Sequence, residues 1–235
     1  MTTTDPAGDG DAPVRETPPV DPFDDRRRAV LAALLDEAPF CGFSVSALRA
    51  AGEQAGEGKA ELALLFPKGV RDVIDFWSRT ADLEALERFA ALDRSEMRIR
   101  DQVTAAVRLR IEALEPHKEA ARRVAATLAL PLYAGLAPRI AWRTADGIWR
   151  ACGDRATDFN HYSKRAILSG VYLSTLAAWQ ADETGERWPS FLDARIDNVM
   201  QFEKVKARAK KAGIDPAAPW RLLGALRYGP AVRDQ

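Results

Sequence analysis

Apolar residues after Asp24 recur at steps of three and four positions, and no stretch alternates as a half-buried strand does. This spacing predicts an all-α fold of about nine to ten helices. The first begins near Asp25, and a short second helix meets a third across a tight turn near Gly56 and Gly58. Further helices are expected at about 69–90, 94–115, 117–130, 137–151, 157–181 and 188–211.

The pattern also divides the chain into four parts. Residues 1–22 are rich in proline, acidic residues, glycine and threonine, which predicts a disordered leader. Residues 23–66 hold the three short helices, and residues 67–211 hold the larger helical bundle. Residues 212–235 follow a glycine- and proline-containing break and form a separate C-terminal segment.

The three N-terminal helices resemble the helix-turn-helix module of TetR-type repressors in order and spacing. In such a module the third helix enters the major groove, where lysine and arginine neutralise phosphates. The segment 38–66 has only two basic residues against three acidic ones: Arg49 and Lys59, with Glu53, Glu57 and Glu61. The sequence therefore predicts a module with the shape of a DNA-binding domain but without its positive charge. We expect no nucleic-acid partner.

Composition places the chain among globular proteins without a strong electrostatic field. Its 235 residues include 34 basic and 34 acidic ones, and 47% are hydrophobic. No run approaches the ~20 apolar residues that a membrane-spanning helix needs. The two cysteines, Cys41 and Cys152, form no CxxC pair, so we expect small core thiols rather than a disulfide or a metal site.

Signals of catalysis are scarce. Neither His117 nor His161 lies in a metal-ligand pattern, and no nucleophile elbow occurs. The glycine-rich run 52–60 fails the phosphate-loop pattern, because its glycine spacing is one residue too long and Ala60 replaces the Mg²⁺-binding hydroxyl. We therefore expect no catalytic site, no metal and no cofactor.

Large apolar residues of the later helices are the candidates for a ligand chamber. Trp142 and Trp149 are one heptad apart and share a helix face, as do Tyr172 and Trp179. These rings either fill a core or line a cavity of the kind that helical bundles keep for ligands. The residues expected to contact a lipid are Leu128, Leu132, Trp142, Trp149, Leu168, Tyr172 and Leu176.

A polar face begins the helix expected at 157–181. Asp158, His161, Tyr162 and Arg165 follow helical spacing and fall on one side. Such a mixed face is either ordinary solvated surface or an interface, since tyrosine and arginine are common at interface hot spots.

Three longer motifs are more specific: LLFPKGVRDVIDFW, WRTADGIWRACGDRATDFNHYSKRAILSGVY and WPSFLDARIDNVMQFEKVKA. Over roughly residues 25–210 they resemble the COQ9 family of ubiquinone-biosynthesis proteins. The resemblance implies a TetR-like fold that no longer represses transcription. It also implies a lipid-binding accessory protein that presents quinone precursors to a partner hydroxylase, which is a di-iron enzyme in the eukaryotic branch.

The same resemblance implies a docking surface for that hydroxylase. The family's docking positions correspond to Asp146, Ile148, Asp158, Tyr162 and Arg165 in this chain. One position departs from the family pattern: His161 stands where a tryptophan is expected before the tyrosine, and we include it in the docking set. This change is expected to affect the choice or affinity of the partner.

The C-terminal segment is a candidate membrane contact. Residues 203–211 are strongly basic, and the following run WRLLGALRY is amphipathic on a helical wheel. Its apolar side is formed by Trp220, Leu222, Leu223 and Leu226. The alternative is a short helix docked on the protein's own bundle.

Together these features predict an accessory protein, not an enzyme, that binds an isoprenoid lipid or quinone intermediate. We expect a cytoplasmic location, peripheral on the inner face of the membrane, with the hydroxylase and the membrane surface as partners. The last two long helices also allow pairing into a homodimer. The principal alternative function is a TetR-like ligand-responsive repressor, and a small helical enzyme is a weaker one.

Overall fold

The computed structural model describes residues 22–154 and 159–211, and every regular element in those ranges is helical. The helices are α1 (Pro22–Cys41), α2 (Val45–Gln54), α3 (Lys59–Leu65), α4 (Val70–Ala90), α5 (Ile99–Glu112), α6 (Lys118–Leu128), α7 (Leu136–Ala151), α8 (Phe159–Ala181) and α9 (Arg187–Lys211). Short 3₁₀ turns, η1 (Glu115–His117) and η2 (Pro131–Tyr133), flank α6. The all-α prediction is confirmed.

The largest difference from the predicted boundaries is at α5. The helix was expected from residue 94 and begins at Ile99 instead. The Asp93 side chain accepts hydrogen bonds from the Ser95 amide at 3.1 Å and from its hydroxyl at 2.8 Å. This local turn competes with helical hydrogen bonding, so the chain enters α5 later than apolar spacing predicts.

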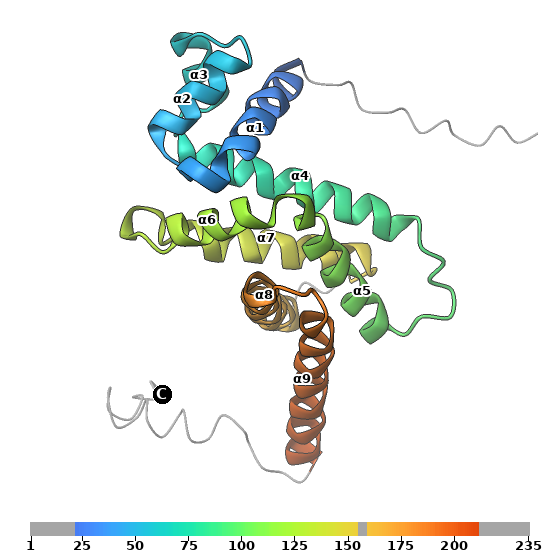
Figure 1. The fold of residues 1–235 in the computed structure, drawn as a ribbon. Coiled ribbons are helices and arrows are strands. Elements are labelled where there is room, and N and C mark those ends of the chain that lie inside the picture. The colour runs from blue at the N-terminus through green and yellow to red at the C-terminus, as the bar shows by residue number, and fades with distance from the viewer. Residues whose placement is uncertain (1–21, 155–158, 212–235) are drawn as a thin grey trace, which may run out of the picture.

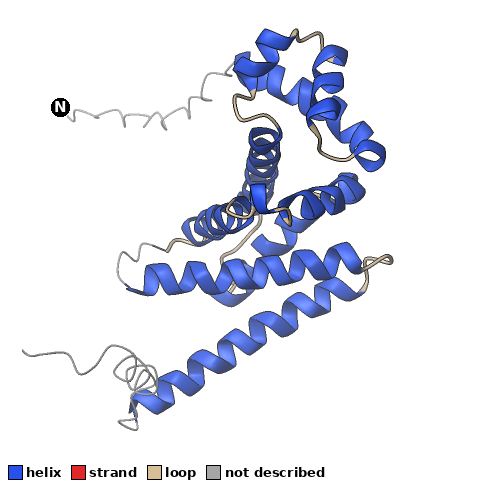
Figure 2. Ribbon diagram, turned by 90° about the vertical axis from the view of Figure 1, so that its left-hand side faces the viewer, coloured by secondary structure: helices blue, strands red, loops and turns tan. Residues whose placement is uncertain are grey.

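The helices form two groups around α4 (Figure 1). Helices α1 to α3 gather at one end of the molecule, whereas α8 and α9 lie at the opposite end, with α6 and α7 between them. Figure 2 shows α8 and α9 running side by side from their connecting turn and diverging toward the C-terminal end of α9. Contacts are most extensive between α7 and α8, α1 and α2, and α4 and α5.

Sequence features explain the compact N-terminal module. The Ser44 hydroxyl caps α2 by accepting from the Ala47 amide at 3.1 Å. Gly56 adopts φ +79° in the turn to α3, a conformation that favours glycine. A Cβ on Gly52 would lie 2.9 Å from Leu62, so glycine at this position lets α2 and α3 pack closely.

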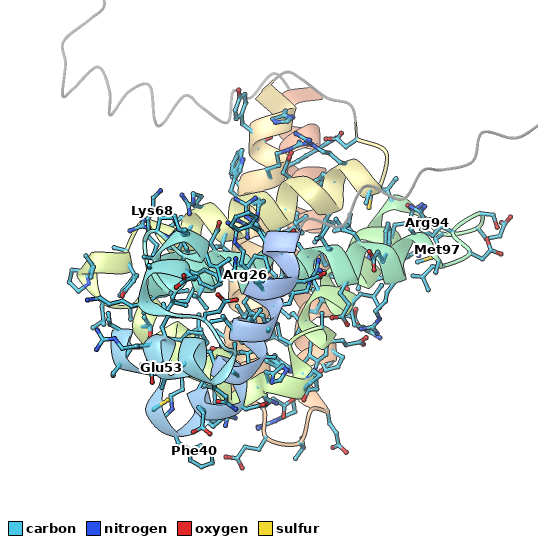
Figure 3. The ribbon with its side chains drawn as sticks, turned by 90° about the horizontal axis from the view of Figure 1, so that it is seen from above. Arg26, Phe40, Glu53, Lys68, Arg94 and Met97 are labelled. Atoms are coloured by element: carbon cyan, nitrogen blue, oxygen red, sulfur yellow. The ribbon has the colours of Figure 1, made fainter. Side chains whose placement is uncertain are left out.

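The predicted core placement of the cysteines is only partly correct. Cys152 is half-buried after α7, but Cys41 is exposed at the end of α1, where neighbouring Phe40 also points outward with 84% of its surface exposed (Figure 3). Cys41 is followed by Gly42, with φ +65°, after which Phe43 is buried in the core against Trp77. The last turn of α1 therefore extends beyond the core.

The leader at residues 1–21 and the segment at 212–235 lie outside the described residues, and so do Asp158 and the predicted membrane residues Trp220, Leu222, Leu223 and Leu226.

Candidate functional site

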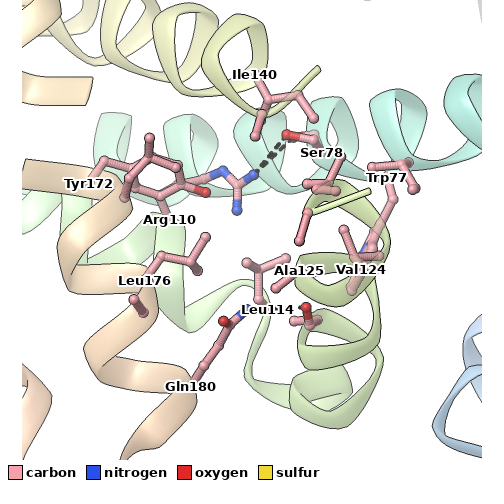
Figure 4. Close-up of a pocket in the computed structure, with 17 residues that line it drawn as sticks. Trp77, Ser78, Arg110, Leu114, Val124, Ala125, Ile140, Tyr172, Leu176 and Gln180 are labelled. Carbon is pink, nitrogen blue, oxygen red and sulfur yellow. Dashed lines mark hydrogen bonds between the residues drawn. The ribbon is translucent and has the colours of Figure 1, made fainter. Parts of the chain in front are cut away.

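A cavity of about 350 Å³ lies among α4, α5, α6, α7 and α8 (Figure 4). Its volume is near the lower end of the ~300–1,000 Å³ typical of ligand pockets. The wall is almost entirely apolar, and the residues that define it best are Ile74, Trp77, Leu114, Val124, Leu128, Ile140, Tyr172 and Leu176. Three of these, Leu128, Tyr172 and Leu176, belong to the set predicted from sequence.

The cavity opens to the surface between α6 and α8. Ala129, Leu173 and Ala177 line it and are also exposed. Directly after Ala129 the chain presents Leu130 and Leu132, with 54% and 75% of their surface exposed. The predicted lipid contact Leu132 therefore lies outside the cavity, on an apolar stretch that follows its lining in sequence.

One charged side chain lines this apolar space. Arg110 of α5 is only 2% exposed, and its Nε donates to Asp82 Oδ1 at 2.5 Å. One terminal nitrogen, Nη2, donates to the hydroxyl and carbonyl of Ser78 at 3.1 and 3.3 Å. The other, Nη1, is buried and finds no acceptor among the residues that the structure describes. The cavity therefore contains a fixed cationic donor with unused capacity.

Tyr172 lies against this guanidinium, 5.6 Å from its ring centroid (Figure 4). Burial raises the pKa of Tyr172, so its phenol stays protonated at neutral pH. The ring thus supplies a neutral polar edge and an electron-rich face beside the cation.

Asp82 holds Arg110 in place through a buried polar network. The same carboxylate accepts from Arg143 Nε at 3.2 Å and from the Thr144 hydroxyl at 2.8 Å. Arg143 in turn donates to Asp75 Oδ1 at 2.5 Å. Asp75 also pairs with Arg79 and Arg139, whose side chains are more than half exposed. The buried part of the network therefore holds two carboxylates and two guanidinium groups, and it ties α4 to α5 and α7.

A second apolar cavity of about 330 Å³ lies among α5, α8 and α9. Trp149 and Leu168 line it, together with Ile99, Val103, Ile167 and Ile196. Trp149 also donates its indole N–H to the Lys164 carbonyl at 3.2 Å. The structure thus divides five of the predicted lipid contacts between two cavities, which are lined by successive stretches of α8.

Trp142 belongs to neither cavity. Its side chain is 37% exposed and packs against Tyr162, with ring centroids 6.3 Å apart. His161 meets the same tyrosine edge-on at 5.1 Å. These three rings form an aromatic surface where α7 and α8 face each other.

The COQ9 family model matches residues 134–203, which comprise α7, α8 and much of α9. The chain is 28% identical to the ubiquinone biosynthesis protein COQ9, mitochondrial, of Rattus norvegicus and 26% identical to that of Homo sapiens. Both alignments cover 78% of this chain but only 62% and 60% of those proteins. The resemblance to the COQ9 family is confirmed.

A TetR transcriptional regulator from Nitrosomonas europaea shares the fold. The superposition has a TM-score of 0.59 at 18% identity and covers 74% of this chain and 97% of the regulator. The TetR-like fold predicted from helix order is therefore confirmed, and at this identity the likeness extends to the fold alone.

The positions that correspond to the COQ9 docking surface have very different exposures. Tyr162 is 61% exposed, whereas Arg165 and Ile148 are buried at 1% and 3%. Arg165 donates to Asp146 at 2.5 Å and to Asp154 at 3.1 Å, which fixes α8 against the end of α7. Of these predicted docking positions, Tyr162 thus lies on the surface, whereas Arg165 and Ile148 lie beneath it.

The most informative residue that sequence reasoning missed is Arg110. A signal was present, because Arg110 falls on the apolar stripe of α5 with Val103, Val107 and Ile111. A charged residue on a buried stripe needs a partner, but the sequence does not show that Asp82 supplies it.

Within the described residues, no single helix combines the length and apolarity needed to cross a membrane; only the pair 99–128 and 131–151, bent by 96°, does so jointly by length and composition.

Proposed function

We propose that this protein is a lipid-binding accessory factor of ubiquinone biosynthesis, without a reaction of its own, that presents an isoprenoid or quinone intermediate to a partner hydroxylase. The COQ9 resemblance supports the pathway. The observation that carries the proposal is the apolar cavity among α4 to α8, with its opening between α6 and α8. Its size accommodates a substituted ring and the first part of a tail, so a long prenyl chain extends through the opening.

The physical task is extraction of a hydrophobic ring from a bilayer. Leu130 and Leu132 beside the opening offer an apolar contact, and the C-terminal run 220–228 offers a second one on sequence grounds. Nearby basic residues add about 1 kcal/mol each on an anionic surface. We infer reversible attachment to the inner membrane surface, in keeping with the expected peripheral location.

Partner docking is assigned to the aromatic surface of Trp142, His161 and Tyr162. Aromatic side chains that are half-exposed and held by a rigid support are typical of interface hot spots. Arg165 and Asp146 provide that support from below. His161 replaces the tryptophan expected in the family, so we expect its reversion to Trp to change affinity for the hydroxylase.

Mass spectrometry of lipids that copurify with the protein tests the cavity. Leu176→Trp is expected to fill the space between α6 and α8 and to abolish recovery of quinone or prenyl lipids. The matched control is Leu64→Trp, at a 68% exposed position on α3 far from the cavity. Equal lipid recovery from the two variants would contradict the proposal.

Membrane attachment has a separate test. Deleting residues 213–235 is expected to leave helicity and melting unchanged and to reduce binding to anionic liposomes sharply. High salt should weaken binding of the intact chain only in part, because the apolar contribution is not screened. Early melting of the truncated chain would show that the segment belongs to the core.

The TetR-like fold favours a second candidate, a ligand-responsive repressor. Against it, Arg26 near the α2–α3 turn is already paired with Glu57 at 2.8 Å and is not free to bind a phosphate, and α3 carries a single lysine against Glu61. Titration of random duplex DNA at low salt separates the candidates, since a repressor binds even non-specific DNA under those conditions. Saturable retardation at micromolar protein would favour the repressor.

A further inference from the structure

The Arg110 guanidinium sits at the wall of the apolar cavity with one of its two terminal nitrogens satisfied. Ser78 holds Nη2, while Nη1 is directed between Leu114 and Leu176 and has no acceptor among the described residues (Figure 4). The side chain is 2% exposed, so bulk water reaches very little of it. A charged donor left without a partner in apolar surroundings is costly, and a ligand that brings an acceptor removes that cost.

The charge balance decides what kind of acceptor fits. Asp82 compensates Arg110 and Asp75 compensates Arg143, so the buried charges cancel. The further partners of Asp75, Arg79 and Arg139, have side chains that are more than half exposed, so water screens their charge. A further buried anion would carry an uncompensated charge into an apolar space. A neutral oxygen can accept the hydrogen bond without that penalty, and the Tyr172 ring beside Arg110 offers a flat surface for a ring that carries it.

We propose that Arg110 is the polar anchor of the cavity and selects amphiphiles with a neutral oxygen, such as a ring carbonyl, on an otherwise apolar head. The head lies beside the Arg110–Tyr172 pair, where a small shift of the side chains that cover Nη1 lets its oxygen accept from that nitrogen, and the tail leaves toward Leu173 at the opening. This proposal rests on the proposed lipid binding in the same cavity. It adds which end of the lipid enters and which chemical group is recognised.

Matched small probes test this selection by calorimetry. Hexyl-1,4-benzoquinone, hexylbenzene and 4-hexylbenzoate share a six-membered ring and a hexyl chain. The quinone carries neutral oxygen acceptors, hexylbenzene carries no acceptor, and the benzoate carries an anionic one. The wild-type protein is expected to bind the quinone at least about tenfold tighter than hexylbenzene, the scale of one hydrogen bond to a charged donor. It should also bind the quinone more tightly than the benzoate.

Arg110→Met is the decisive variant. Asp82 keeps Arg143 and the Thr144 hydroxyl as partners, so the carboxylate does not become an isolated charge. The quinone preference should fall to about twofold or less, with affinity for hexylbenzene maintained. If circular dichroism shows that Arg110→Met does not fold, Arg110→Lys is the second variant. Lysine keeps a cation beside Asp82 but has no nitrogen at the position of Nη1. It is therefore also expected to lose the preference for the quinone.

The outcomes separate this inference from the proposed function. A wild-type protein that binds all three probes without preference, or an Arg110 variant that retains the full preference, overturns the anchor and leaves lipid binding intact. Tightest binding of the benzoate overturns the neutral head group. Failure of the wild-type protein to bind any probe, or unchanged binding in Leu176→Trp, overturns the cavity function itself.

Discussion

Replacing Arg165 with methionine tests whether the proposed docking surface depends on a buried ion pair. Arg165 is 1% exposed and bonds Asp146, Asp154 and the His161 carbonyl at 2.5, 3.1 and 3.1 Å. Methionine keeps the apolar stem but leaves two carboxylates without their shared partner. We therefore expect the attachment of α8 to the end of α7 to weaken.

The expected loss in the free energy of unfolding depends on which ion-pair partners the two carboxylates retain. Removing one member of a buried pair typically costs ~3–5 kcal/mol. Asp146 keeps Arg150 at 2.9 Å and Asp154 keeps Lys164 at 2.8 Å, so the cost should lie near the lower end of that range. About 3 kcal/mol corresponds to a melting temperature lower by roughly 6–12 °C for a chain of this size.

The assay is urea and thermal unfolding followed by circular dichroism, with Tyr162→Ala as the matched control on the same helix. Tyr162 is 61% exposed, so its removal should change the free energy of unfolding by less than about 1 kcal/mol. The proposed docking predicts that capture of a hydroxylase falls in both variants. Only in Tyr162→Ala should capture fall while stability is unchanged. If Arg165→Met unfolds at the same urea concentration and temperature as the wild-type protein, the structural role of Arg165 is refuted.

Two further predictions concern titration and thiol reactivity. Burial would raise the pKa of Asp182, but hydrogen bonds from the Trp188 and Arg187 amides at 2.9 and 2.7 Å outweigh it and hold the pKa far below its usual value. The stabilisation that Asp182 gives to the start of α9 is therefore complete above pH ~4 and is lost as the pH falls. In Asp182→Asn the free energy of unfolding should decrease less steeply as the solution is acidified. An unchanged dependence on pH would contradict this assignment. Burial also raises the pKa of Cys152 to about 11, so iodoacetamide at pH 8 should modify exposed Cys41 well before Cys152, as peptide mass mapping would show.

The sequence by itself determined the helical class and the TetR-like order, because helical periodicity and turn residues such as Gly56 act over a few positions. The acidic character of the α2–α3 module was also visible, since net charge needs no coordinates. The COQ9 motifs indicated the family because they are long enough to be specific.

The site could not be derived in the same way. Trp142 and Trp149 share a helix face in sequence, yet one contributes to an exposed aromatic surface and the other to a cavity, because α8 covers only part of α7. Tyr162 and Arg165 are three residues apart, and one is exposed while the other is buried.

Arg110 shows the physical reason most directly. Its role depends on Asp82 and Ser78, which lie 28 and 32 residues earlier in the chain, and on the apolar wall that α6 and α8 supply. Periodicity shows that a residue lies on the inner face of its helix, but the packing of distant helices decides whether a charge there is paired, buried or left with a free donor. Only the tertiary structure placed that donor beside the cavity.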